Sequence, residues 1–180
     1  IVFGDWSSDV CSSDLELSHI PKVKDAIPNI TIDEVKKSII NNLYLQGIGL
    51  ESLGCLASLP KLSKISLNEN NFQEEALSIP LLQNLTHCKI AHNRITRLPE
   101  ARYPKLVLLE VSYNPIEGIE KQLEPEQFPR LCGFGGCGLQ MNEIPATLRQ
   151  FPNIQGLFLS HNAIASIPPW LFENPRLVML

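Results

Sequence analysis

The chain has 180 residues, 44% of them hydrophobic, and a formal net charge of −4 at pH 7. So small a charge gives no electrostatic reason to expect nucleic acid or an anionic membrane surface as a partner. The sequence contains no run of about 18 uncharged apolar residues and hence no membrane-spanning segment, and its length suits one domain with a sizeable core.

Residues 1–15 differ from the rest of the chain in composition and pattern. The stretch DWSSDVCSSDL (residues 5–15) has no helical or strand periodicity, and it resembles, codon for codon, the translation of a common sequencing adapter. We therefore predict that residues 1–15 are not native protein, with a serine-rich linker as the alternative. This segment holds three aspartates and no basic residue, so residues 16–180 stand near −1.

Residues 16–39 form a flank before the patterned part of the chain. The stretch TIDEVKKSII begins with a capping box of Thr31 and Glu34, and Ile32, Val35 and Ile39 share one helical face. We expect this helix to cover one end of the domain that follows.

Residues 40–180 are repetitive. Four segments share one template: LSKISLNENNF from Leu62, LTHCKIAHNRI from Leu85, LVLLEVSYNPI from Leu106 and IQGLFLSHNAI from Ile154. Apolar residues recur at template positions 1, 4, 6 and 11, with Cys88 as one variant, and asparagine recurs at position 9. Weaker copies begin at Ile40, Leu131 and Leu177, so the starts 40, 62, 85, 106, 131, 154 and 177 are about 23 residues apart.

This template resembles the signature of the leucine-rich repeat proteins, L-x-x-L-x-L-x-x-N/C-x-L. The resemblance covers residues 40–180 and implies an α/β fold: a right-handed horseshoe-shaped solenoid with a parallel sheet on its concave face and loops or short helices on its convex face. The last copy stops at Leu180, so we expect the natural chain to continue.

The residues support the same fold directly. Positions 3 to 7 of each copy alternate between outward and inward sides, as in a strand, and parallel strands need a crossover of this length. Stacked copies would bury one ladder of apolar side chains. The ninth-position asparagines should turn inward and satisfy backbone groups of adjacent repeats; they are Asn70, Asn93, Asn114 and Asn162.

The copy from Leu131 departs from the template. Leu139 replaces the ninth-position asparagine and Gly136 stands where a core leucine belongs, whereas a start near Phe134 would restore Asn142 to the ninth place. We keep the start at Leu131. The glycine cluster CGFGGCG (residues 132–138) indicates a loosely packed strand, or a place where another group approaches the backbone closely.

No motif in the sequence supports catalysis or a cofactor. It lacks a P-loop, a dinucleotide fingerprint, a paired zinc motif and a nucleophile elbow, so we predict neither enzyme activity nor a metal or other cofactor. The cysteines do not cluster at one end as in the disulfide caps of the repeat family. This favours a cytoplasmic location, with an extracellular receptor ectodomain as the alternative.

What remains is a surface suited to a protein partner. A sheet of six strands is nearly 30 Å across, enough for a standard interface. We predict that the partner contacts residues that project from the sheet or its rim, namely Tyr44, Lys64, His87, Lys89, His92, Glu110, Tyr113, Phe158 and His161. The predicted function is a protein-interaction scaffold or receptor segment. The alternative is the substrate-recognition arm of a larger enzyme, such as a ubiquitin ligase or a kinase.

Overall fold

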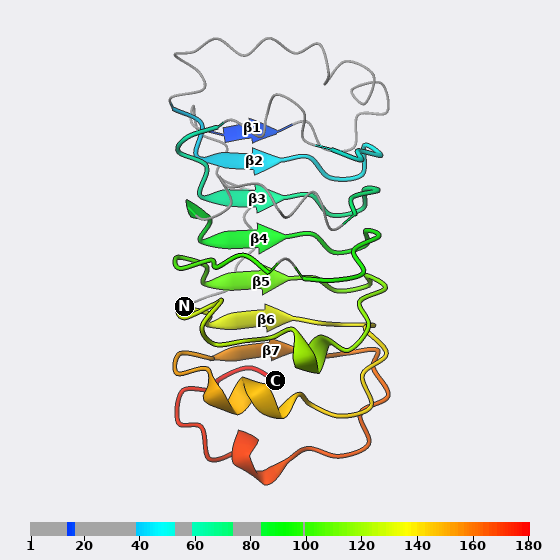
Figure 1. Cartoon of the computed structure of the whole chain (residues 1–180), viewed down its shortest axis with the longest axis vertical. Coiled ribbons are helices and arrows are strands. Elements are labelled where there is room, and N and C mark those ends of the chain that lie inside the picture. Colours follow the sequence, from blue (N-terminus) through cyan, green and yellow to red (C-terminus); the bar gives the residue numbers. More distant parts are fainter. Residues whose placement is uncertain (1–13, 17–38, 53–58, 74–83, 99) are drawn as a thin grey trace.

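The computed structural model describes residues 14–16, 39–52, 59–73, 84–98 and 100–180. Within these ranges seven strands form one parallel sheet in chain order (Figure 1). The strands are β1 (Asp14–Glu16), β2 (Asn42–Tyr44), β3 (Lys64–Ser66), β4 (His87–Lys89), β5 (Leu108–Glu110), β6 (Gly133–Gly135) and β7 (Gly156–Phe158). The predicted leucine-rich-repeat solenoid with a parallel sheet is confirmed.

The strand register follows the repeat template. Lys64, the third residue of its repeat, pairs with His87, and His87 pairs with Leu108. Leu108 in turn pairs with Gly133, which is a third residue only if that repeat starts at Leu131. The pairing therefore agrees with the start at Leu131 and not with one near Phe134.

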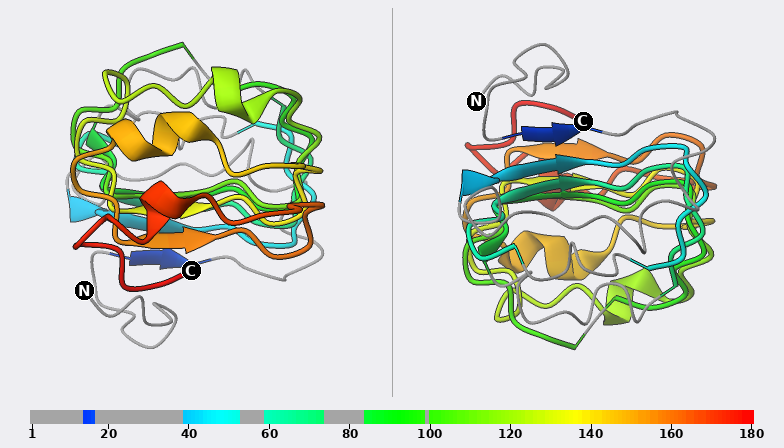
Figure 2. Two further views of the ribbon diagram at one scale, coloured as in Figure 1. Left: turned by 90° about the horizontal axis from the view of Figure 1, so that it is seen from below. Right: turned by 90° about the horizontal axis from the view of Figure 1, so that it is seen from above.

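The core lies between the sheet and a wall of short turns on the opposite side (Figure 2). The middle residue of each strand from β2 to β7 is buried: Leu43, Ile65, Cys88, Leu109, Phe134 and Leu157. Among the described residues, the opposite wall contains three 3-10 helices, η6 (Ile119–Lys121), η7 (Ala146–Gln150) and η8 (Pro169–Leu171). Each of them buries one apolar residue, Ile119, Leu148 or Leu171. Each fully buried aliphatic side chain stabilises the fold by roughly 1.5–3 kcal/mol.

The glycine cluster of β6 is closely packed. A Cβ atom at Gly136 would lie 2.8 Å from Cε1 of Phe134 and 3.2 Å from Cδ1 of Leu139. The ring of Phe134 thus occupies the space that a leucine fills in other repeats. The expectation of a loosely packed strand is wrong, and the close approach of other groups to this backbone is what the structure shows.

The amino-terminal part of the sheet begins at β1, whose Asp14 and Glu16 pair with Asn42 and Tyr44 of β2. Asp14 and Leu15 belong to the segment that we assign to the adapter, and the origin of that segment stays a prediction. Residues 31–38 of the predicted capping helix lie outside the described residues. In the described part of the chain, no helix combines the length and apolar character needed to cross a bilayer.

Candidate functional site

The face of the sheet that is turned away from the core, called the sheet face below, is formed by the first and third residue of each strand. From β2 to β7 these pairs are Asn42 and Tyr44, Lys64 and Ser66, His87 and Lys89, Leu108 and Glu110, Gly133 and Gly135, and Gly156 and Phe158. Six of the predicted contact residues therefore share one surface.

These six residues differ in how much of each side chain is accessible. Lys64, Lys89, Glu110 and Phe158 are half-buried. Tyr44 is only 8% exposed and thus presents little area to a partner, in contrast to the expectation that it projects freely.

Basic and imidazole groups occupy β3 and β4 on the sheet face. The ring Nδ1 of His87 lies 2.9 Å from the hydroxyl oxygen of Thr86. Burial, together with the positive charges of Lys64 and Lys89, lowers the pKa of His87 to about 4. The His87 ring is therefore neutral at pH 7, and the positive charge of this region comes from the two lysines.

An acidic group follows on β5. The carboxylate of Glu110 accepts a hydrogen bond from the backbone N–H of Ser112 at 2.9 Å. It also lies over Gly135 of the next strand, so closely that any side chain at Gly135 would collide with it. The sheet face thus changes from basic at β3 and β4 to acidic between β5 and β6.

The third residue after the strand in successive repeats adopts a left-handed backbone conformation and forms the rim of the sheet face. We define the rim row as Glu69, His92, Tyr113, Gly138 and His161, with φ between 53° and 62°. The N–H of His92 donates to the carbonyl of Ser112 at 2.9 Å, and that of Tyr113 to the carbonyl of Cys137 at 2.8 Å. These bonds fix the row in register.

Three aromatic rings of the rim row are in contact. The rings of His92 and Tyr113 are stacked with centroids 4.3 Å apart, and the ring of His161 is tilted against Tyr113 at 5.9 Å. The second contact spans two repeats because Gly138, between them, has no side chain: a Cβ there would lie 2.5 Å from the Tyr113 ring. The structure thus brings together three of the predicted contact residues.

The imidazoles do not form a metal centre with other ligands. Within the described ranges, no group of three or more His, Cys, Asp or Glu side chains is placed to hold a metal ion. His92 and His161 each contact the ring of Tyr113 instead.

The ninth-position asparagines connect adjacent repeats; Asn70, Asn93 and Asn114 are buried and Asn162 is half-buried. The amide of Asn93 donates to the carbonyl of Leu67 in the preceding repeat at 2.9 Å and accepts from the N–H of Phe72 at 3.0 Å. Asn70, Asn114 and Asn162 each make the same two kinds of bond. Each of these four side chains thus bonds to the backbone of the preceding repeat.

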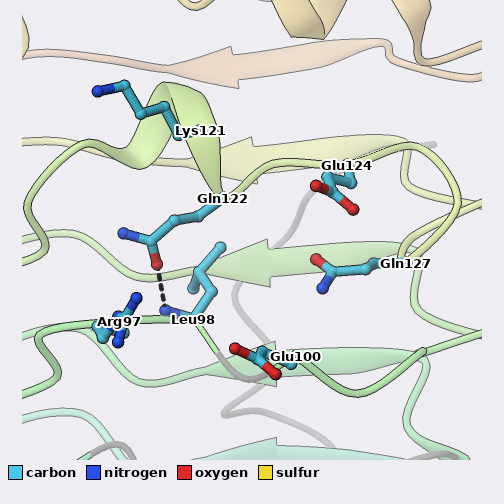
Figure 3. A pocket seen from close by; sticks show the side chains of 7 residues that line it. All are labelled: Arg97, Leu98, Glu100, Lys121, Gln122, Glu124 and Gln127. Carbon is cyan, nitrogen blue, oxygen red and sulfur yellow. Dashed lines mark hydrogen bonds between the residues drawn. The ribbon is translucent and has the colours of Figure 1, made fainter.

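A polar hollow lies on the side of the solenoid opposite the sheet face (Figure 3). It is lined by Arg97, Leu98, Glu100, Lys121, Gln122, Glu124 and Gln127. The amide oxygen of Gln122 accepts a hydrogen bond from the N–H of Leu98 at 2.7 Å. Since this bond ties two repeats together, we assign Gln122 a structural role.

Two residues of the surface were missed by the sequence reasoning. The side chain of Glu110 packs against Gly135 of the next repeat, and the ring of Tyr113 packs against Gly138. The glycine cluster was the available signal, but the sequence did not indicate which side chains would approach it.

The short parallel strands at a spacing near 23 residues and the interior asparagine bonds define the class of protein: the fold is a leucine-rich-repeat solenoid. No protein-family model matches the chain. Among curated proteins, keratocan of Mus musculus is 27% identical over 142 residues, 74% of this chain and 38% of keratocan. Lumican of Rattus norvegicus is 28% identical over 162 residues, 85% of this chain and 46% of lumican. The matched part is less than half the length of either relative.

Proposed function

We propose that the chain is a protein-interaction module that binds a protein partner through its sheet face and rim row and has no catalytic activity of its own. The observation that carries this proposal is the contiguous row of His92, Tyr113 and His161 beside the charged columns of the sheet face. His92 and His161 are exposed, and Tyr113 is 39% exposed. Aromatic side chains at such positions are frequent anchors of protein interfaces.

The backbone of the rim row supports a role in recognition. His92, Tyr113 and His161 have φ values of 53°, 55° and 58°, a region in which a bulky side chain is strained. Gly138 occupies the equivalent place in its repeat without that strain. Large rings at three of these places are therefore not required by the fold and are consistent with selection for binding.

The comparisons support an extracellular setting for the module. Keratocan and lumican are small leucine-rich proteoglycans, structural proteins secreted to the extracellular matrix. We therefore propose the extracellular location, in place of the cytoplasmic one that the cysteine pattern favoured. No observation favours the alternative function as the recognition arm of a larger enzyme.

A capture experiment from extracellular matrix extract tests the proposal. Tyr113→Ala and Phe158→Ala remove ring area from the rim and sheet face and should each weaken partner binding by over about 2 kcal/mol if the residue is an anchor. Arg149→Ala is the matched control, since Arg149 lies on the opposite side and forms an exposed 3.6 Å ion pair with Glu173, which contributes little. Normal binding by both sheet-face variants together with loss in the Arg149 variant would place recognition elsewhere.

A further inference from the structure

A second surface is formed by the turns that precede the strands. The sequence Pro-Lys-Leu occurs at residues 60–62 and 104–106, and Pro-Arg-Leu at 129–131 and 175–177. In each copy the leucine N–H donates to the carbonyl three residues earlier, at 3.1 to 3.3 Å. Proline is favoured at the second position of such a β-turn, so the basic residue stands at the third position in all four.

The strand register stacks these turns into one column. Lys61, Lys105 and Arg130 lie three residues before Lys64, Leu108 and Gly133, which pair in successive strands through His87. Arg176 lies three residues before Met179, which forms a bridge with Gly156. The remaining two places in the column belong to Asn84 and Asn153. Because parallel strands are about 4.8 Å apart, the six places span about 24 Å. The stacked turns lie at the start of the strands (Figure 1).

We call Lys61, Lys105, Arg130 and Arg176 the basic stripe. Two of its side chains are held in place by the asparagine of the preceding repeat. The Lys105 ammonium donates to Oδ1 of Asn84 at 2.9 Å. The Arg176 guanidinium donates to Oδ1 of Asn153 at 2.8 Å and to the carbonyl of Pro152 at 2.6 Å.

The stripe carries one sign of charge. Burial raises the pKa of the Cys132 thiol, whereas the positive charges of Arg130 and Arg176 oppose that rise, which places both charges near Cys132. All four basic residues are exposed, and none pairs with a carboxylate of the described residues. A chain with a net charge of −4 thus carries a line of positive charges, not paired with any carboxylate of the described residues, in the turns that precede its strands.

We propose that the basic stripe binds a linear sulfated polysaccharide that runs along the solenoid axis. The stripe is long and narrow and presents cations at intervals of one or two strands, which suits a chain of regularly spaced anionic groups. Two of the turns begin with an aromatic residue, Tyr103 or Phe128, but these rings are buried and stacked on each other. The four turns of the stripe therefore present no exposed aromatic anchor of the kind on which protein interfaces depend. This surface is separate from the sheet face and goes beyond the proposed function.

Binding of the full chain to immobilised heparin tests the proposal. The variant Lys105→Ala/Arg130→Ala/Arg176→Ala should bind about tenfold more weakly. The slope of log Kd against log salt concentration should also fall by roughly two to three. Arg94→Ala/Arg97→Ala/Lys121→Ala is the control, because it removes three exposed basic residues away from the stripe and has the same net charge. It should bind within about twofold of the original chain.

Equal losses in the two triple variants would overturn the proposal, since binding would then follow net charge alone. The proposal would also be overturned if soluble polyglutamate displaced the chain from immobilised heparin as effectively as soluble heparin does, because the ligand would then be an acidic polypeptide. Circular dichroism checks that both variants fold. Tyr113→Ala should leave heparin binding unchanged. The stripe variant should still capture the protein partner. Failure of this proposal is therefore distinguishable from failure of the proposed function.

Discussion

Asn114 shows how a single amide connects two repeats. Its Nδ2 donates to the carbonyl of Ile90 at 2.9 Å, and its Oδ1 accepts from the N–H of Ile95 at 3.0 Å. The side chain is 3% exposed, so water cannot replace these bonds. We expect Asn114→Ala to lower the free energy of unfolding by about 1–3 kcal/mol in urea denaturation, because buried backbone groups lose their partners. Asn84→Ala, at an exposed position, should change it by less than about 0.5 kcal/mol. Equal effects of the two substitutions would contradict the structural role of Asn114.

His87 provides a test of the sheet face by titration. Its pKa is lowered from the usual 6.5 to about 4 by burial and by Lys64 and Lys89. Between pH 6.5 and 4 the unfolded chain therefore binds more protons than the folded chain. The free energy of unfolding should fall as the pH decreases through this range, with the full loss reached below pH 4.

NMR titration of the His87 ring should show a midpoint near pH 4. His87→Gln should remove the corresponding part of the pH dependence of stability. A midpoint near 6.5 would show that the ring is solvated and that the two lysines do not act on it.

Some residue-level features followed directly from the sequence and others did not. The asparagine bonds were predictable because the ninth position recurs in one local conformation. The contact between Tyr113 and His161 was not, because it depends on the missing side chain of Gly138 in a repeat that departs from the template. A contact that crosses two repeats cannot be derived from the pattern of one.

At the scale of the element, the repeat that contains β6 has two glycines, Gly135 and Gly138, that are approached closely by side chains of the preceding repeat. Gly138 has φ 62° and faces the Tyr113 ring, whereas Gly118 has φ 63° with its nearest neighbour, Oε1 of Glu120, 3.6 Å from an added Cβ. Alanine at either place should cost about 1–2 kcal/mol for the left-handed backbone. Only Gly138→Ala must also displace Tyr113, so we expect it to cost a further 1–3 kcal/mol, as overpacking does. Urea denaturation of both variants measures this difference.

The Gly118 variant is the matched control for backbone strain. A displaced Tyr113 should also change the ring-current shift of the His92 protons in the Gly138 variant alone. Equal stability of the two variants would mean that Tyr113 moves aside without cost, and the rim row would then be less ordered than the structure indicates.

For the whole molecule, the repeat period predicted the order of the strands in the sheet. The net charge of the chain, in contrast, gave no indication of the basic stripe. The stripe residues are widely separated in the sequence and their charges are outnumbered by acidic residues elsewhere. The register brings them into one column, because every turn lies the same number of residues before its strand. The net charge therefore describes the surface as a whole and does not exclude a local region of the opposite sign.

The remaining question at this scale is where the solenoid begins. β1 pairs with β2 over three residues, although Asp14 and Leu15 lie in the predicted adapter segment and no repeat template covers them. Among the described strands β1 pairs with β2 alone, and a segment of adapter origin, as predicted, would not have been selected to pack there. We therefore expect a chain of residues 16–180, compared with residues 14–180, to lose less than about 1 kcal/mol of unfolding free energy. A deletion of equal length at the other end, residues 179–180, is the control, because Met179 forms an isolated bridge with Gly156 of the last strand. A loss above that value on removing Asp14 and Leu15 alone would show that these two residues belong to the fold, and the assignment of residues 1–15 to an adapter would then fail at its boundary.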